Sequence, residues 1–345
     1  MFDVIAIGGA TLDFFVESSK FNILDLKSID SHKELLCMGY GDKIEIEQSS
    51  FDIGGGAVNT SVAFTKLGLN TSLLSKTGAG HIGNYLMSKV RSRNVDTSLV
   101  VKSRVDRTGF SIILTSFEGD RTVLTQRGAN STLVKDEINW NSLKSTKAIY
   151  CSSLSNASEE VLADIAEFCH QNNIKFACNP GATTIKKGIE SQGENLSHTN
   201  ILVLNKHEAS DLTGIIEKTE SKYDEVAENG INSYIKNMLV TLKNLVKDAV
   251  VITDGKKGVY VYDGQKFYFA KPYPAKVVST LGAGDAFAST FVGTMIKTGD
   301  IQKAIALALI NSASVVGSYG AQTGLKTYDE LIEIYLKANI EILVS

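Results

Sequence analysis

Short apolar runs alternate with amphipathic segments along most of this chain, and this alternation constrains the fold more than any other feature. The runs predict buried strands at residues 4–7, 71–74, 148–151, 175–178, 201–204 and 250–253. Between them, a periodicity of about 3.6 residues predicts helices over residues 59–67, 82–94, 159–172 and 234–246. Strands that alternate with helices are typical of a three-layer α/β fold, with a mostly parallel central sheet and helices on both faces.

Two stretches depart from this rhythm and predict a small β-sheet beside the main one. Residues 110–116 and 121–126 alternate apolar and polar side chains around Glu118-Gly119-Asp120, as an antiparallel hairpin does. The segment 14–53 is also strand-like in places, with the same alternation at residues 43–47. We therefore expect one domain, 1–345, with lid segments at about 14–53 and 104–130. Such a sheet could exclude water from a site, or be a surface embellishment or a dimer interface.

Composition and charge limit the classes of function that this chain can have. Hydrophobic content of 43% and charged content of 21% are ordinary for a globular protein. A net charge of −3 and a pI near 6.0 give no electrostatic footprint for nucleic acid. No basic leader or membrane-length apolar run is present, and the four cysteines lack metal-ligand spacing. We expect a soluble, cytoplasmic protein with buried, reduced thiols, and neither a nucleic-acid nor a membrane partner.

The segment that runs from Thr280 through Gly282, Ala283 and Gly284 to Asp285 leads directly into a predicted helix. The first N–H groups of a helix have no intrahelical acceptor and carry partial positive charge, so an anion can bind there. Asp285 would then stand beside a bound phosphate as a proton acceptor. The alternative is that Asp285 caps the helix and the glycines serve a tight turn.

A second set of polar and small residues suits a polyhydroxylated ligand. Gly54 and Gly55 leave backbone amides open to close approach, and Asn59 offers both a donor and an acceptor. Asn59 could also cap a helix. Asp13 follows the first predicted strand and could accept hydrogen bonds from two hydroxyl groups; the alternative is a turn residue.

Taken in order, four motifs resemble those of the ribokinase-like (PfkB) carbohydrate kinases, and the resemblance covers nearly the whole chain. The glycine pair at residues 54–55 precedes Asn59 and a helix that ends in Leu67-Gly68. An Asn-x-x-Glu motif occupies residues 205–208, and a Thr-x-Gly-x-x-Gly loop occupies residues 253–258. Residues 280–285 match the second family signature.

The resemblance implies ATP-dependent phosphoryl transfer to an alcohol group of a small sugar or sugar acid, with Mg²⁺ bound with the ATP. By resemblance, Asp285 is the general base, and the amides of Gly282, Ala283 and Gly284 form the anion hole. Glu208 would organise the metal through water. The acceptor would contact Asp13, Gly54, Gly55 and Asn59, and ATP would contact Asn205, Thr253, Gly255, Gly258 and Asn311, although helix packing explains Asn311 nearly as well.

Several positions depart from the family pattern. Ser279 replaces the first aspartate of the second signature, in a region that shapes a monovalent-cation site in many relatives. Gly320-Ala321 resembles the other side of that site, so activation by K⁺ stays open. Gly56 stands where typical ribokinases carry lysine, and Ser152-Ser153 replaces an expected sugar-holding acid. These differences argue against simply naming the protein a ribokinase.

The acceptor is the least constrained part of the prediction. Arg107 and Asn130 border the predicted hairpin and would face the acceptor, where an arginine suits an acidic sugar, although it could equally be a surface ion-pair partner. Phe14, Phe15 and Phe110 are compatible with a nucleoside kinase of the same superfamily. A non-catalytic sugar-binding regulatory protein is the second alternative, and a homodimer could form through the lid.

Overall fold

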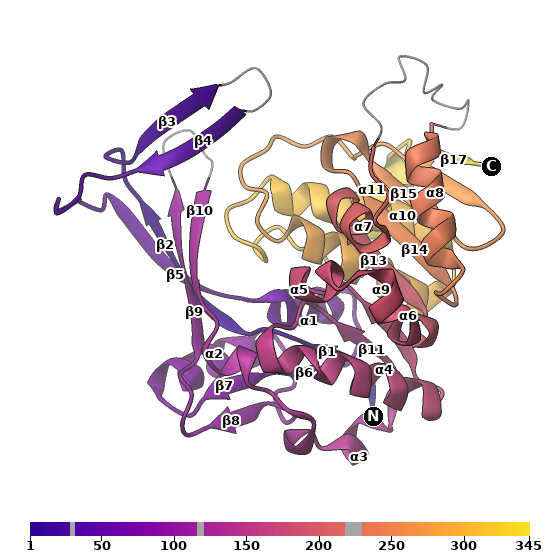
Figure 1. Ribbon diagram of the computed structural model, residues 1–345, viewed down its shortest axis with the longest axis horizontal. Coiled ribbons are helices and arrows are strands. Elements are labelled where there is room, and N and C mark those ends of the chain that lie inside the picture. Colours follow the sequence, from indigo (N-terminus) through magenta and orange to yellow (C-terminus); the bar gives the residue numbers. More distant parts are fainter. Residues whose placement is uncertain (28–31, 116–120, 218–229) are drawn as a thin grey trace.

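A nine-stranded sheet forms the centre of the structure, a computed structural model that describes residues 1–27, 32–115, 121–217 and 230–345 (Figure 1). The strand order is β17 (Ile342–Val344), β16 (Phe267–Ala270), β15 (Val259–Tyr262), β14 (Ala249–Thr253), β13 (Ile201–Asn205), β12 (Lys175–Cys178), β11 (Thr146–Cys151), β1 (Phe2–Ile7) and β6 (Thr71–Leu74). Pairing is parallel from β6 to β14 and antiparallel from β14 to β17.

Helices cover both faces of this sheet, as the alternation in the sequence predicts. Along β14, Val250 and Ile252 pack into one core while Ala249 and Val251 pack into the other, so both faces of the strand are buried. The first core includes α4 (Val161–Gln171), α6 (Gly188–His198), α7 (Lys206–Thr213) and α8 (Ser233–Lys243). The second includes α1 (Gly56–Lys66), α9 (Ala283–Thr298) and α10 (Ile301–Val316).

The remaining helices are peripheral to these two layers. Part of α2 (His81–Ser92) packs with α1, and α11 (Tyr328–Lys337) packs on α10. Two shorter helices, α3 (Trp140–Leu143) and α5 (Ala182–Lys186), complete the set among the described residues. The strands and helices predicted for the central sheet and its two faces are present, with ends that differ by three residues or fewer.

The predicted small sheet is also present and stands beside the α/β body (Figure 1). Its strand order is β10 (Arg121–Gln126), β9 (Gly109–Thr115), β2 (Thr11–Glu17) and β5 (Gln48–Gly54), and we call it the lid sheet. The predicted hairpin pairs β9 with β10, and its turn at residues 118–120 lies outside the described residues. A second hairpin, β3 (Asn22–Lys27) with β4 (His32–Cys37), extends from this sheet, and β7 (Lys76–Gly78) pairs with β8 (Val101–Ser103).

The strand expected at residues 43–47 is wrong, because this segment has no ladder partner. Ile44 packs against a small cluster formed by Val16, Phe21 and Leu114, which accounts for one apolar position of the alternation. The Ser18 hydroxyl donates to the Glu45 carbonyl at 2.8 Å, where a strand partner would otherwise bind. One backbone hydrogen bond, from Glu47 N to the Glu17 carbonyl at 3.0 Å, precedes the regular ladder, which begins at β5.

Two further expectations concern the whole chain. Three of the four cysteines are buried and all four are free thiols, and burial raises the pKa of Cys169 and of Cys178 to about 12. Within the described ranges, every helix is too short or too polar to cross a bilayer.

Candidate active site

Polar side chains collect at the carboxyl ends of the parallel strands. Asn205 ends β13 and Thr253 ends β14, and the two are direct neighbours in the sheet register. Asn179 follows β12, and Ser152 follows β11. Ligands of open α/β sheets bind outside this edge, and the fold places residues from distant motifs along it.

Asp285 lies in the first turn of α9, and its carboxylate faces α1 rather than its own helix. Asn59 Nδ2 donates a hydrogen bond to Asp285 Oδ2 at 2.8 Å. The N-terminal cap of α9 is Gly282, which adopts a left-handed conformation with φ 76° and makes no side-chain cap. The interpretation of Asp285 as a helix cap is therefore wrong.

The backbone before Asp285 is partly exposed and needs a glycine at residue 282. A Cβ built on Gly282 would lie 2.5 Å from the Cβ of Ala321, and the positive φ at Gly282 adds to that restriction. A Cβ on Gly284 would meet no atom within 4 Å, so space is open beside this turn. Amides of a first helical turn lack intrahelical acceptors, and Ala283 N makes only a long 3.4 Å turn contact with Thr280 O. This geometry suits an anion.

Burial sets the electrostatics of Asp285. It raises the pKa of the Asp285 carboxyl from 3.8 to about 6, and the hydrogen bond from Asn59 opposes that rise. A general base is most effective when its pKa lies near the working pH. The side chain is half-buried, so a reacting group can still reach it.

The predicted acceptor residues converge on the same corner. Asp13 is buried in β2, its Oδ1 accepts a hydrogen bond from Thr11 Oγ1 at 2.9 Å, and burial raises its pKa. A Cβ on Gly54 would clash with Asp13 Oδ2, and a Cβ on Gly55, where φ is 91°, would lie 2.4 Å from the Gly9 carbonyl oxygen. A side chain at residue 54 would therefore displace the Asp13 carboxylate, and residue 55 requires glycine.

Gly56 links this acceptor corner to the base. A Cβ on Gly56 would lie 3.7 Å from Asp285 Oδ1 and 2.8 Å from Ser152 Oγ. A lysine at this position would therefore need the neighbouring Ser152 side chain to move. The absence of the family's usual lysine matches the space that the structure offers.

Asn59 is the fourth residue of α1, and the helix cap is Gly55, so the capping interpretation of Asn59 is wrong. Both ends of its amide are used. While Nδ2 contacts Asp285, Oδ1 accepts a hydrogen bond from Gln322 Nε2 at 2.7 Å. Sequence reasoning missed Gln322, which lies directly after the Gly320-Ala321 pair.

The Asn-x-x-Glu motif forms a capping box at the start of α7. Asn205 Oδ1 accepts a hydrogen bond from Glu208 N at 2.9 Å, and Glu208 Oε2 accepts one from Asn205 N at 2.8 Å. Asn179 Nδ2 also approaches Glu208 Oε2, at 3.3 Å, and sequence reasoning missed this residue although it directly follows a predicted strand. Burial raises the pKa of Glu208. His207, between the two motif residues, is exposed.

A carboxylate such as that of Glu208 fits Mg²⁺ held mainly by phosphates and water. Within the described ranges, no group of three or more His, Cys, Asp or Glu side chains could form a protein-only metal cage. Glu208 is held in place by the backbone of Asn205 and the amide of Asn179. The donor set is therefore compatible with a metal that arrives with the nucleotide.

The loop after β14 is compact and rich in backbone groups. Gly255 (φ 49°) and Gly258 (φ 121°) adopt positive φ, and Asp254 N donates to the Gly258 carbonyl at 2.8 Å. A Cβ on Gly258 would lie 2.3 Å from the Ala270 carbonyl oxygen, whereas a Cβ on Gly255 would meet no atom within 4 Å. The space around Gly255 is therefore open, so a ligand beside Thr253 could approach the backbone of this loop.

Asn311 is fully buried between helices. Its Nδ2 donates to Thr290 Oγ1 at 2.8 Å, and its Oδ1 accepts from Lys326 N at 2.9 Å. Helix packing therefore accounts for both ends of this side chain. A contact between Asn311 and the nucleotide stays a prediction.

Asn130 and Arg107 border the acceptor corner in different ways. Both ends of the Asn130 amide bind the backbone of Ala10, each at 2.9 Å, so this side chain fixes the turn between β1 and β2. Arg107 is exposed, and its carbonyl accepts a hydrogen bond from Ala129 N at 2.8 Å. Contacts of either residue with an acceptor stay predictions.

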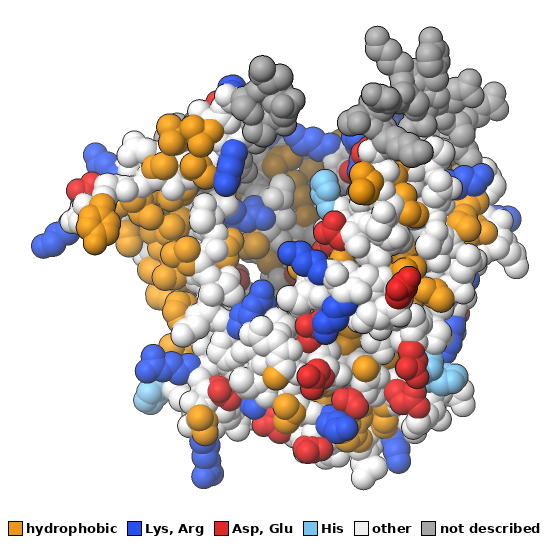
Figure 2. Space-filling view, viewed as in Figure 1, with side chains coloured by type: hydrophobic (Ala, Val, Ile, Leu, Met, Phe, Trp, Pro, Cys, Tyr) orange, Lys and Arg blue, Asp and Glu red, His pale blue; other side chains and the backbone are white. Residues whose placement is uncertain are grey.

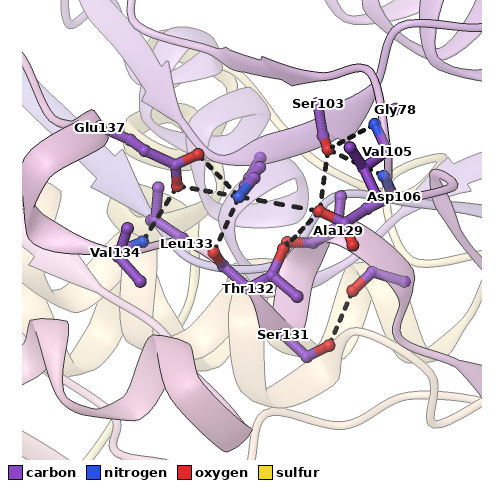
Figure 3. Close-up of polar contacts among 12 residues, drawn as sticks. Gly78, Ser103, Val105, Asp106, Ala129, Ser131, Thr132, Leu133, Val134 and Glu137 are labelled. Atoms are coloured by element: carbon purple, nitrogen blue, oxygen red, sulfur yellow. Dashed lines mark hydrogen bonds and ion pairs between the residues drawn. The ribbon is translucent and has the colours of Figure 1, made fainter.

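A buried lysine, Lys76, holds the loops that carry these two residues. Lys76 Nζ donates to the Thr132 carbonyl at 2.8 Å and forms an ion pair with Glu137 at 2.8 Å. Asp106 lies 3.8 Å from the same nitrogen and accepts hydrogen bonds from Ser103 Oγ at 2.8 Å and Thr132 Oγ1 at 2.9 Å. Figure 3 shows how this cluster joins the two loops.

A cleft of about 490 Å³ separates the lid sheet from the body, and Figure 2 shows the hollow between them. Phe15, Asp52 and Ile113 line the cleft from the lid sheet, and Ser279 and Tyr319 line it from the body. Arg121 of β10 reaches across, and its Nη1 donates to Thr280 Oγ1 at 2.9 Å. The lid sheet thus contacts the segment that leads into Asp285.

Comparisons with known proteins identify the family of the chain. The model of the pfkB family carbohydrate kinases matches residues 23–328. A ribokinase of Staphylococcus aureus is 24% identical over 85% of this chain and 92% of its own length. A nucleoside kinase of Methanocaldococcus jannaschii is 26% identical over 84% of this chain and 87% of its own length.

Solved structures show the same fold. The ribokinase of Arabidopsis thaliana, solved with ribose and ATP, superposes with a TM-score of 0.77 at 19% identity, over 97% of this chain and 98% of that one. A protein of Escherichia coli solved with ATP and Mg²⁺ gives a TM-score of 0.74 at 16% identity, over 98% of this chain and 99% of that one. At these identities the likeness establishes the architecture.

Proposed function

Because the chain belongs to the pfkB family of carbohydrate kinases, we propose that it transfers the γ-phosphoryl group of ATP to an alcohol group of a small sugar or sugar acid. One observation carries the proposal. The hydrogen bond from Asn59 to Asp285 joins residues 226 positions apart, and so brings the first glycine-rich motif to the second. A carboxylate, an open helix N-terminus and a glycine-lined polar corner then lie together.

In this proposal Asp285 accepts the proton of the attacking hydroxyl group, because its raised pKa near 6 makes it a base that is ionised at neutral pH. The amides of Gly282, Ala283 and Gly284 bind the charge that develops on the transferring group. Mg²⁺, when bound with ATP, would neutralise polyphosphate charge. Glu208 and Asn205 would hold the metal and phosphates, beside the loop at Thr253, Gly255 and Gly258.

The acceptor hydroxyl groups would bind Asp13 and the amides of Gly54 and Gly55. Asp13 is buried, and burial raises the pKa of its carboxyl, so a ligand that donates hydrogen bonds to it gains more than it would in water. Asn130 would act on this corner through Ala10. Arg107 is exposed beside it and would attract an acidic sugar.

A nucleoside acceptor is the second candidate. Phe15 and Ile113 project from the lid sheet into the cleft, where a planar base could pack against them. The similarity to the nucleoside kinase of M. jannaschii supports the same reading.

A panel of sugars, sugar acids and nucleosides, assayed for ADP formation, tests the proposal and separates the two candidates. We expect turnover with at least one member, and loss of that turnover in Asp285→Asn. Binding of panel members without ADP formation would favour a non-catalytic regulatory protein instead.

Dependence on K⁺ is a separate prediction. Ser279 carries no charge, and its hydroxyl accepts a hydrogen bond from Leu281 N at 3.2 Å within its own turn. We therefore expect turnover to change less than about twofold when KCl replaces the chloride of a large inert cation, because a neutral oxygen attracts a cation less strongly than a carboxylate. A larger activation would show that backbone carbonyls near Gly320 suffice.

The outer face of the lid sheet favours a homodimer. Phe14 and Phe51 stack with their ring centroids 4.4 Å apart, and Phe51 remains 59% exposed. Leu124 of β10 is 52% exposed, and hydrophobic side chains gather over these strands (Figure 2). We propose that a second copy of the chain covers this face, since such apolar patches mark interfaces.

A further inference from the structure

Gln322 is a buried side chain whose two amide hydrogens are both used in hydrogen bonds. It is 7% exposed, and Nε2 donates to the Ile53 carbonyl at 2.8 Å and to Asn59 Oδ1 at 2.7 Å. Its Oε1 is buried without a protein partner. The amide therefore serves as a double donor in this position.

The hydrogen bond that Gln322 donates to Asn59 determines which end of the Asn59 amide faces Asp285. The oxygen and nitrogen of an amide lie on opposite sides, so an Oδ1 held by Gln322 directs Nδ2 toward Asp285 Oδ2. A reversed Asn59 amide would place two NH₂ groups in contact on one side and two oxygens on the other. Both contacts would be repulsive, and each would be buried.

We propose that Gln322 is a positioning residue, which fixes the orientation of the Asn59 amide so that Asn59 presents only its NH₂ group to Asp285. The inference rests on the proposed function, in which Asp285 is the general base. It assigns to the Gln322 side chain a role in the reaction without contact with either substrate.

The same side chain ties the lid sheet to the base. Ile53 belongs to β5 and directly precedes Gly54, so the bond from Gln322 holds the point where the lid sheet meets the acceptor corner. One amide thus contacts a strand of the lid sheet and, through Asn59, the first turn of α9. Movement of β5 at Ile53 would disturb both.

The other groups around Asp285 leave this hydrogen bond as its main polar support. α1 and α10 pack against α9, and their charged side chains, Lys66 and Lys303, lie at the ends far from Asp285. From β11, the buried phenol of Tyr150 is neutral, because burial and the Asp285 carboxylate raise its pKa well above 10. Within the described part of the chain, no ion pair reaches Asp285.

The test is Gln322→Met, which keeps the length of the side chain and removes both donors. Without the donor, Asn59 can turn its oxygen toward Asp285, so the carboxylate loses support and its pKa rises. We expect the acid limb of the kcat–pH profile to move upward by about one pH unit, the size of one hydrogen bond to a charged group. KM for ATP should stay within about twofold. The matched control is Gln302→Met at the exposed start of α10.

A ¹³C NMR titration of the Asp285 carboxyl group gives a readout that assumes no catalytic role. It should show the same upward shift of the pKa in Gln322→Met. If Asp285→Asn kept full turnover, the proposed function would fail while the titration still tested the role of Gln322. A titration identical to that of the unsubstituted protein would overturn the inference.

A double-mutant cycle asks whether Gln322 acts through Asn59. In an Asn59→Ala background, Gln322→Met should produce no further shift of the Asp285 pKa, because the connecting amide is gone. A shift of equal size in both backgrounds would overturn the inference. Should Gln322→Met fail to fold, Gln322→Leu removes the same two donors without adding a charge. It should shift the pKa of Asp285 in the same direction.

Discussion

Asp285 is held between two opposing influences. Burial disfavours its charge and raises its pKa, while the Asn59 amide stabilises the charge and limits that rise. Because the folded pKa of about 6 lies above the ordinary 3.8, the folded protein loses stability as pH rises from about 4 to 6. The cost is about 3 kcal/mol above that range. At neutral pH, the buried negative charge of the proposed base therefore destabilises the folded protein.

Replacement of this carboxylate separates catalysis from folding. We expect Asp285→Asn to lower kcat by about 10²- to 10⁴-fold, since proton acceptance by a positioned base contributes that much. KM for ATP should change little, and the free energy of unfolding at pH 7.5 should stay equal or rise, because the buried charge is removed. Steady-state kinetics and urea unfolding measure the two effects. Turnover near that of the unsubstituted protein would remove Asp285 from the base role.

The pH dependence of turnover follows from the same group. Asp285 accepts a proton only when ionised, so kcat should rise with pH through about 6 and level off above it. The acid limb should have the slope of a single ionisation. A rate profile from pH 4.5 to 8.5 measures it, with circular dichroism at each pH as the control for folding. A limb centred near 4 would show that Asp285 is not the titrating base.

Residues within a motif were predictable, and residues that join motifs were not. Asp285, Gly282 and Gly55 stand in short patterns with a local reason for each residue type, and the structure places them at turns and helix starts as expected. Gln322 contacts Asn59 across 263 positions, and Asn179 contacts Glu208 across 29. No periodicity or spacing in the chain marks such pairs.

At the scale of elements, burial on two faces made the central strands predictable. β12 and β14 are continuous apolar runs because helices cover both of their faces, and such runs stand out in the sequence. The segment 14–53 was predicted to be strand-like only in places, and β3 and β4 within it were not located individually, because most of β3 is exposed and its alternation is weak. At residues 43–47 the error is the reverse: the alternation predicted a strand where none is present, because Ile44 is apolar and packs in a cluster without being in a strand.

The cluster around Lys76 should contribute to the stability of the loops beside the acceptor corner. Lys76→Met leaves Glu137 and Asp106 without their buried partner, and we expect a loss of about 2–4 kcal/mol in the free energy of unfolding. Urea unfolding measures this loss. Lys147→Met is the matched control, because the Lys147–Asp3 ion pair is exposed and should contribute less than about 1 kcal/mol. Equal effects of the two substitutions would contradict a special role for the buried cluster.

For the whole molecule, the two faces of the lid sheet have different environments. One face lines the cleft of about 490 Å³ over the body, and Arg121 bridges that cleft to Thr280. The other carries Phe14, which stacks on Phe51, and the exposed Leu124; Phe51 belongs to the edge strand β5 and also borders the cleft. A sheet with apolar side chains on its outer face is stable in water when something covers that face, which links the position of the lid sheet to the oligomeric state.

The proposed homodimer gives the prediction at this scale. Phe51→Asp and Leu124→Asp place charge on the outer face, and we expect each to convert a dimer into a monomer in sedimentation velocity at micromolar concentration. Burial of a charge against an apolar partner face costs several kcal/mol, which exceeds what one side-chain contact returns. Leu336→Asp is the matched control, because Leu336 is 78% exposed on α11, away from the lid sheet. If the unsubstituted protein sediments as a monomer at every concentration, the outer face has another partner. Monomeric variants that keep full kcat would show that the acceptor corner is complete within one chain.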